Sequence, residues 1–213
     1  MKPADSDAAT ILLLGNGPLA KAIADRLRRG GSKVAETASL DPAAVASALA
    51  GIASLESLVI LAPEPRLGTP MLEVTDRQLE ASLAEFLDLF GALSLALPRL
   101  ADGGGLVAVS ARGHLGAWGG AHEMAFSGAV AGLLRSVALE NMDRGVRANV
   151  IAIDPPAAGG GADPTQIADL TQYLLSSESA AVNGELILAN GGRSLKMREA
   201  RDRRGARKSI AAQ

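Results

Sequence analysis

The sequence predicts an α/β protein in which a parallel sheet is covered by helices on both faces. Short apolar runs alternate with helical stretches from residue 10 to residue 189. The runs are apolar on both faces of the expected strands, which is typical of parallel strands buried between two helix layers. The first run also ends in a glycine-rich turn that opens a helix. Together these observations predict a doubly wound sandwich of three layers.

The elements follow one another in a regular order. Strands are expected within residues 10–17, 32–36, 57–63, 105–111, 146–153 and 184–189, and helices within residues 18–30, 41–51, 76–100, 123–140 and 163–177. Two helix starts carry a specific signal, because Asp41 and Asp163 each precede a proline. An aspartate caps the free backbone N–H groups of a helix, and proline is tolerated at the first helical position.

The segment between Gly31 and Asp41 is unusually short. It reads SKVAETASL, whereas a full doubly wound half needs a second strand, a helix and a third strand there. The sheet is therefore expected to be abridged between its second and third strands.

Composition sets the class of protein. The chain has 213 residues, a net charge of −2, a hydrophobic content of 48% and no cysteine. These values are typical of one globular domain in a reducing compartment. We expect the domain to span residues 1–192 and the compartment to be the cytoplasm. No uninterrupted apolar run reaches the roughly 18 residues of a membrane span, and the amino terminus has no apolar signal region. Neither a membrane nor a nucleic acid is expected as a partner, and no metal site is predicted.

A basic tail follows the domain at residues 193–213. It holds eight lysines and arginines, at positions 193, 196, 198, 201, 203, 204, 207 and 208, against Glu199 and Asp202. Such a tail could bind phosphates, form an interface arm or extend into solvent, and the sequence leaves these alternatives open.

The glycine-rich turn after the first strand suggests a nucleotide site. Gly15, Gly17 and Ala20 have the G-x-G-x-x-A spacing, with which a backbone turn approaches a pyrophosphate at a helix amino terminus. Glu36 lies near the spacing of a ribose-binding carboxylate. The same spacing also fits a tight turn that binds nothing, so the motif alone does not decide.

Three longer blocks carry a family resemblance. Residues 101–113, 127–156 and 163–192 resemble the central strand, the helix with its following strand, and the last helix and strand of the short-chain dehydrogenases/reductases. The resemblance extends from Ile11 to Gly192 and implies a Rossmann-like three-layer sandwich.

The resemblance implies that the family's proton-transfer residues are missing. Its Tyr-x-x-x-Lys motif maps to Met124 and Gly128, neither of which can ionise. Its carbonyl-polarising serine maps to Ala111. The neighbouring Ser110 is expected to point to the opposite face, because side chains alternate along a strand. The family's helix asparagine maps, within about one turn, to Glu85.

The cofactor supports also depart from the family pattern. The glycine loop is replaced by the shorter Gly15, Asn16 and Gly17, which we interpret as a vestigial cofactor loop. The Asn-Asn-Ala-Gly segment of the family maps to residues 60–63, where only the alanine is kept. We therefore expect this chain to bind no cofactor, with NAD(P) held by an active partner.

The resemblance implies a non-catalytic subunit that assembles with an active short-chain dehydrogenase, with 3-hydroxyacyl-CoA-type substrates as one option for that partner. Helices near 78–98 and 124–140, with the last strand near 185–190, are the expected contact surfaces. Two alternatives stay open. The first is an atypical NAD(P)-dependent oxidoreductase in which Glu85, or His122 with Glu123, replaces the tyrosine. The second is a sensor of a nucleotide or an acyl ligand.

Overall fold

The computed structural model describes residues 9–155 and 162–195, which build one six-stranded sheet. All strand pairs are parallel, in the order β2-β1-β3-β4-β5-β6. The strands are β1 (Thr10–Leu14), β2 (Lys33–Thr37), β3 (Leu55–Leu61), β4 (Leu100–Ala111), β5 (Arg147–Ile153) and β6 (Leu186–Leu188). The predicted fold class is confirmed.

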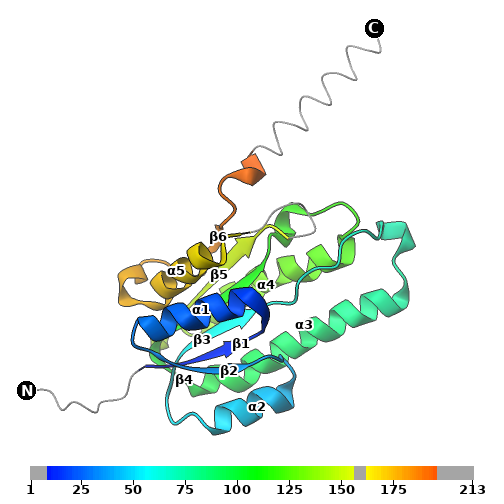
Figure 1. The fold of residues 1–213 in the computed structure, drawn as a ribbon. Helices are drawn as coiled ribbons and strands as arrows, with labels where there is room; N and C mark the ends of the chain where they lie inside the picture. Colours follow the sequence, from blue (N-terminus) through cyan, green and yellow to red (C-terminus); the bar gives the residue numbers. More distant parts are fainter. Residues whose placement is uncertain (1–8, 156–161, 196–213) are drawn as a thin grey trace, which may run out of the picture.

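Helices cover both faces of this sheet (Figure 1). The helices are α1 (Gly17–Arg29), α2 (Pro42–Ala50), α3 (Asp76–Ala96), α4 (Ala121–Glu140) and α5 (Pro164–Leu175). The helices α1 and α5 pack on one face, and α2, α3 and α4 pack on the other. The result is the three-layer sandwich that the alternation of apolar runs predicts.

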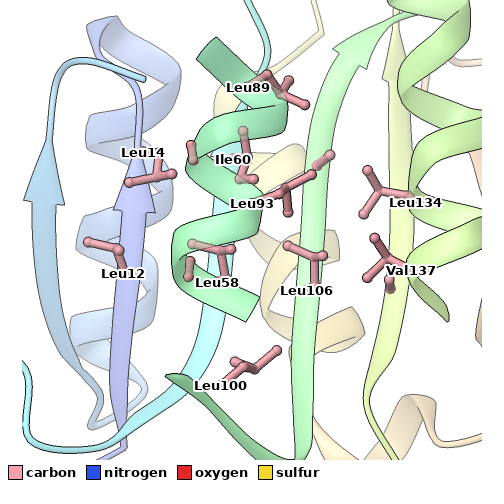
Figure 2. Close-up of a cluster of buried hydrophobic side chains, with 14 of the residues drawn as sticks. Leu12, Leu14, Leu58, Ile60, Leu89, Leu93, Leu100, Leu106, Leu134 and Val137 are labelled. Carbon is pink, nitrogen blue, oxygen red and sulfur yellow. The ribbon is translucent and has the colours of Figure 1, made fainter. Parts of the chain in front are cut away.

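Two hydrophobic clusters hold the layers together, because successive strand residues point to opposite faces. Leu106 and Ala108 of β4 face α2, α3 and α4, whereas Val107 and Val109 face α1 and α5. Figure 2 shows the first cluster, in which leucines of the central strands meet Leu93 of α3 and other helical side chains. This alternation fixes which face each residue at the end of a strand presents.

The sheet is abridged as expected. The strand β2 pairs only with β1, which makes it an edge strand among the described residues, and the chain then passes through α2 directly to β3. Because β2 and β3 lie on opposite sides of β1, the topological switch point falls between β1 and β3. Open α/β sheets bind their ligands outside the carboxyl ends of the strands at such a point.

Helix caps explain several boundaries. The Asp41 carboxylate accepts hydrogen bonds from the backbone N–H groups of Ala43 and Ala44, and the Asp163 carboxylate accepts one from Thr165. Both caps follow from the Asp-Pro signal in the sequence. Strand β4 begins before the expected start at residue 105, because Leu100 pairs with Leu55 of β3.

The helix α3, with the turn that follows it to Arg99, is long and apolar enough to cross a membrane by length and composition alone. One side of it belongs to the core, where Leu89, Leu93 and Ala96 are buried against the sheet. Its other side exposes Leu83, Leu87 and other apolar side chains to solvent.

Of the basic tail, only residues up to Leu195 are described, and the remaining part of that prediction lies outside the described residues.

Candidate functional site

A cleft of about 710 Å³ opens at the carboxyl ends of the strands, at the switch point. Its volume lies in the range of small-molecule and cofactor sites. The glycine loop, the ends of β3, β4 and β5, and two residues of α3 line it. Of the residues singled out in the sequence, Gly15, Asn16, Gly17, Glu85 and Ala111 line this cleft, whereas Met124 and Gly128 do not.

The glycine loop packs closely against β3. Gly15 has a φ of +135°, and a Cβ atom there would lie 2.7 Å from the Cβ of Leu61, so no other residue fits without movement. Gly17 has a φ of +88°, and the space beside it is open. The first turn of α1 has no side-chain cap, which leaves backbone N–H groups free to receive an anion.

The ribose side of the cleft differs from the sequence prediction. Glu36 is not among the residues that line the cleft, because it forms an ion pair with Arg28 of α1. The segment after β2 supplies Ala38, Ser39 and Leu40 instead. The carboxylate that the spacing suggested for the ribose is therefore turned away from the cleft.

Ser110 and Ala111 point to opposite faces of the sheet, as the alternation of side chains along a strand predicts, but Ser110 is not thereby removed from the cleft. Ser110 continues the alternation of Leu106 and Ala108, so it is Ser110 that faces the layer of α3 and α4, while Ala111 faces the layer of α1 and α5. The Ser110 hydroxyl lies in the cleft wall, is buried, and makes no hydrogen bond within the described residues. Which face of β4 belongs to the cleft depends on the helices that cover it, and the spacing of a motif does not contain that information.

The turn after β4 lies on the part of α4 where the family's tyrosine and lysine would project. A Cβ atom on Gly113 would lie less than 3.0 Å from both the carbonyl oxygen of Met124 and the amide nitrogen of Gly128. The Met124 side chain is buried beside Gly120. Both family positions are therefore covered by backbone and lie outside the cleft.

Replacing Gly113 by alanine tests this close packing. The added methyl group meets backbone atoms of α4, so we expect the free energy of unfolding to fall by about 1 to 3 kcal/mol. The matched control is Gly132→Ala on α4, where no atom lies within 4 Å of the added carbon. Chemical denaturation that shows equal stability for the two variants would contradict this packing.

An arginine that the sequence analysis missed ties Glu85 in place. Arg66, in the loop between β3 and α3, donates from Nη1 and Nη2 to the two Glu85 oxygens at 2.6 and 3.1 Å, and from Nε to Glu123 Oε1 at 2.9 Å. The hydrogen bonds to Glu85, and to a smaller extent the hydrogen bond to Glu123, raise the pKa of Arg66 above its ordinary value. Glu85 thus lines the cleft as one half of a bidentate ion pair.

The histidine alternative is partly supported by geometry. His122 and Glu123 are both buried, and His122 Nε2 lies 3.6 Å from Glu123 Oε1. His122 Nδ1 has no hydrogen-bond partner within the described residues. Neither residue lines the main cleft, although Glu123 borders a small cavity of about 30 Å³ that shares Glu85 with it.

A buried ion pair lies at the carboxyl ends of β4 and β5, where Asp154 lines the cleft. Arg112, which follows β4, and Asp154, which follows β5, are both buried and directly paired. Asp154 also lies 3.3 Å from Arg193 Nε and accepts a hydrogen bond from the Asn190 amide at 3.4 Å. These contacts join the ends of three neighbouring strands. Arg112 and Asp154 are 42 residues apart, so no local sequence signal reveals the pair.

Comparisons with known proteins place the fold. No family model matches the sequence, and no curated protein matches it. Among solved structures, a doubly substituted mutant of a Serratia marcescens short-chain dehydrogenase/reductase is similar, with a TM-score of 0.79 and 22% identity over 87% of this chain and 97% of that one. Levodione reductase gives a TM-score of 0.78 and 19% identity over 89% of this chain and 98% of that one.

A third similar structure bears on the cofactor. The 3-ketoacyl-(acyl-carrier-protein) reductase of Brucella melitensis, complexed with NADH, gives a TM-score of 0.77 and 17% identity over 88% of this chain and 99% of that one. The expectation that our chain binds no cofactor is therefore wrong. That expectation equated lost side chains with a lost site, whereas the cleft is open and the glycine loop still lines it.

The six-stranded parallel sheet and its two helix layers agree with these comparisons. Each of the three similar structures matches most of this chain and nearly all of its own. The chain has the fold of the short-chain dehydrogenases/reductases.

Proposed function

We propose that this chain is a cytoplasmic subunit of an oxidoreductase complex, which binds a nicotinamide dinucleotide but performs no proton transfer itself. It would act by assembling with an active short-chain dehydrogenase. The observation that carries the proposal is that Met124 and Gly128 stand at the family's tyrosine and lysine positions, where neither can ionise, and that the turn at Gly113 packs against the backbone of both.

The glycine loop supports the cofactor part of the proposal. Backbone N–H groups at the start of α1, beside the open space at Gly17, suit a diphosphate. The bound dinucleotide would supply hydride donation or acceptance. Ser110 offers its unpaired hydroxyl as a hydrogen-bonding group in the same cleft.

The lining of the cleft argues against ordinary proton transfer. Among the described residues that line it there is no tyrosine, lysine or histidine. A positioned general acid or base contributes about 10² to 10⁴ in rate. Of the substitutes for the tyrosine predicted from the sequence, only Glu85 lines the cleft, and it is held by Arg66. Hydride transfer to a carbonyl would therefore lack its proton donor.

The outer surface of α3 and α4 supports the assembly part. The two helices lie side by side, with the rings of Phe86 and Phe126 5.8 Å apart. Outward from this contact, α3 exposes the apolar side chains Leu79, Leu83, Leu87 and Phe90. Next to them, α4 presents small residues at positions 125, 129, 132 and 136, which allow close approach of another helix. A partner that covers this surface would remove a large apolar area from water.

The remaining parts of the proposal concern the partner. The edge strand β6 is a second candidate contact, since Leu188 is exposed there. By analogy with the family, we propose that the active partner acts on 3-hydroxyacyl-CoA-type substrates.

A second candidate function is an atypical oxidoreductase. The unpaired hydroxyl of Ser110 and the carboxylate of Glu85 line one cleft, so a carbonyl could be bound between a donor and an acid. A ligand sensor is the third reading, in which binding is reported through the α3 and α4 surface.

One pair of assays on the purified chain separates the non-catalytic subunit from the atypical oxidoreductase. Calorimetry with NAD⁺ and NADP⁺ measures binding, and a stopped assay with NADH, NADPH and a 3-ketoacyl thioester measures turnover. We expect binding without turnover from the chain alone. Turnover that is lost in Glu85→Gln would favour the atypical enzyme, and the absence of binding would contradict the cofactor part.

A further inference from the structure

We infer that the cleft selects a dinucleotide without a 2′-phosphate, and that Glu64 and Asp88 exclude the phosphorylated form. This inference rests on the proposed function, because it presupposes that a nicotinamide dinucleotide binds in the cleft. It concerns residues outside the family motifs discussed above.

The charged side chains that line the cleft are all acidic among the described residues. The described residues that line the cleft include four carboxylates, Glu64, Glu85, Asp88 and Asp154, and neither a lysine nor an arginine. Two of the four carboxylates form ion pairs with arginines that do not line the cleft: Glu85 with Arg66, and Asp154 with Arg112 and Arg193. Glu64 and Asp88 make no hydrogen bond or ion pair within the described part of the chain. They therefore present uncompensated negative charge to a ligand.

The two carboxylates reach the cleft from two different elements. Glu64 follows the end of β3, the strand beside β1 at the switch point. On α3, Asp88 lies one turn before Gly91, and a Cβ atom on Gly91 would lie 3.2 Å from Pro42, the first residue of α2. Asp88 therefore lies near the segment of Ser39 and Leu40, which lines the same end of the cleft.

No basic group among the described lining residues offsets them at that end. The residues that reach the cleft after β2 are Ala38, Ser39 and Leu40. Arg28 of α1 is paired with Glu36 of β2 and donates a hydrogen bond to the carbonyl oxygen of Val34. A 2′-phosphate, with close to two negative charges at neutral pH, would be repelled by these carboxylates, whereas a ribose 2′-hydroxyl carries no charge for them to repel.

The diphosphate, which both dinucleotides share, would be bound by other groups than Glu64 and Asp88. It would be received by the backbone N–H groups of the glycine loop and of α1, at the positive end of a helix of 13 residues. The buried, unpaired hydroxyl of Ser110 marks the same cleft as a ligand site independently of that helix end. Selection and binding thus depend on different residues.

Calorimetry of the full chain with NAD⁺ and with NADP⁺ at low and moderate salt tests the inference. We expect NAD⁺ to bind at least about tenfold more tightly than NADP⁺. The ratio of the two affinities should decrease as the salt concentration rises, because salt screens exposed charges. In the double variant Glu64→Gln/Asp88→Asn, we expect NADP⁺ affinity to rise about tenfold while NAD⁺ affinity stays the same. Unchanged NAD⁺ affinity also shows that the variant is folded.

The matched control is Glu80→Gln, which removes one negative charge from an exposed position of α3 outside the cleft lining. It should leave the preference unchanged. Equal affinity for the two dinucleotides, tighter binding of NADP⁺, or an equal shift in the control would overturn the inference and leave the proposed cofactor binding intact. Binding of neither dinucleotide would overturn the cofactor proposal and the inference with it.

Discussion

Replacing Leu87 and Phe90 on the outer side of α3 by glutamate is expected to weaken assembly by at least about 100-fold. The two side chains are 57% and 49% exposed, and the surface that they share with α4 is apolar. A buried hot-spot side chain in an interface contributes about 2 kcal/mol or more, and a carboxylate buried without a partner adds a desolvation cost. Analytical ultracentrifugation of the co-expressed complex would measure the loss.

A charge on the opposite face of the sheet provides the control. Tyr173 on α5 is 42% exposed, similar to the α3 side chains, and belongs to the other helix layer. The variant Tyr173→Glu should leave assembly unchanged. If the α3 variant assembles normally, or if both variants lose assembly equally, then the α3 and α4 surface is not the contact that we propose.

Replacing Arg112 by leucine is expected to lower the free energy of unfolding by about 3 to 5 kcal/mol, because it leaves the carboxylate of Asp154 buried with less compensation. The side chains of Arg112 and Asp154 are only 3% and 6% exposed. The loss should be much smaller in Arg112→Leu/Asp154→Leu, where both buried charges are removed. Urea denaturation of the variants gives both values.

An exposed ion pair on the other helix layer supplies the comparison. Arg26 of α1 and Asp169 of α5 are paired, with side chains 34% and 55% exposed. Pairs of that kind contribute about 0 to 1 kcal/mol, so Arg26→Leu should change stability little. An Arg112→Leu variant as stable as Arg26→Leu would show that the buried pair does not hold the strand ends together.

The sequence predicts the fold well because its signals are local. Apolar runs such as Leu12–Leu14 define buried strands, and the Asp-Pro pairs at Asp41 and Asp163 define helix starts. The missing strand is equally local, since the short segment after Gly31 has no room for it. Each of these features depends on residues a few positions apart.

The site is less predictable because its contacts are distant in sequence. The face that Ser110 presents depends on which helices cover which side of the sheet, and the spacing of one motif does not contain that information. The bridge from Arg66 to Glu123 joins residues 57 positions apart. The cofactor expectation was wrong for a related reason, because a glycine loop binds through its backbone, and the loss of family side chains does not remove that backbone.

Native mass spectrometry of the chain, co-expressed with any short-chain dehydrogenase encoded beside it, tests the central claim most directly. We expect a hetero-oligomer that contains this chain together with a homologue whose Tyr-x-x-x-Lys motif is intact, and that dissociates when α3 carries the two glutamates. A homomer of this chain that reduces a carbonyl substrate without any partner would contradict the account.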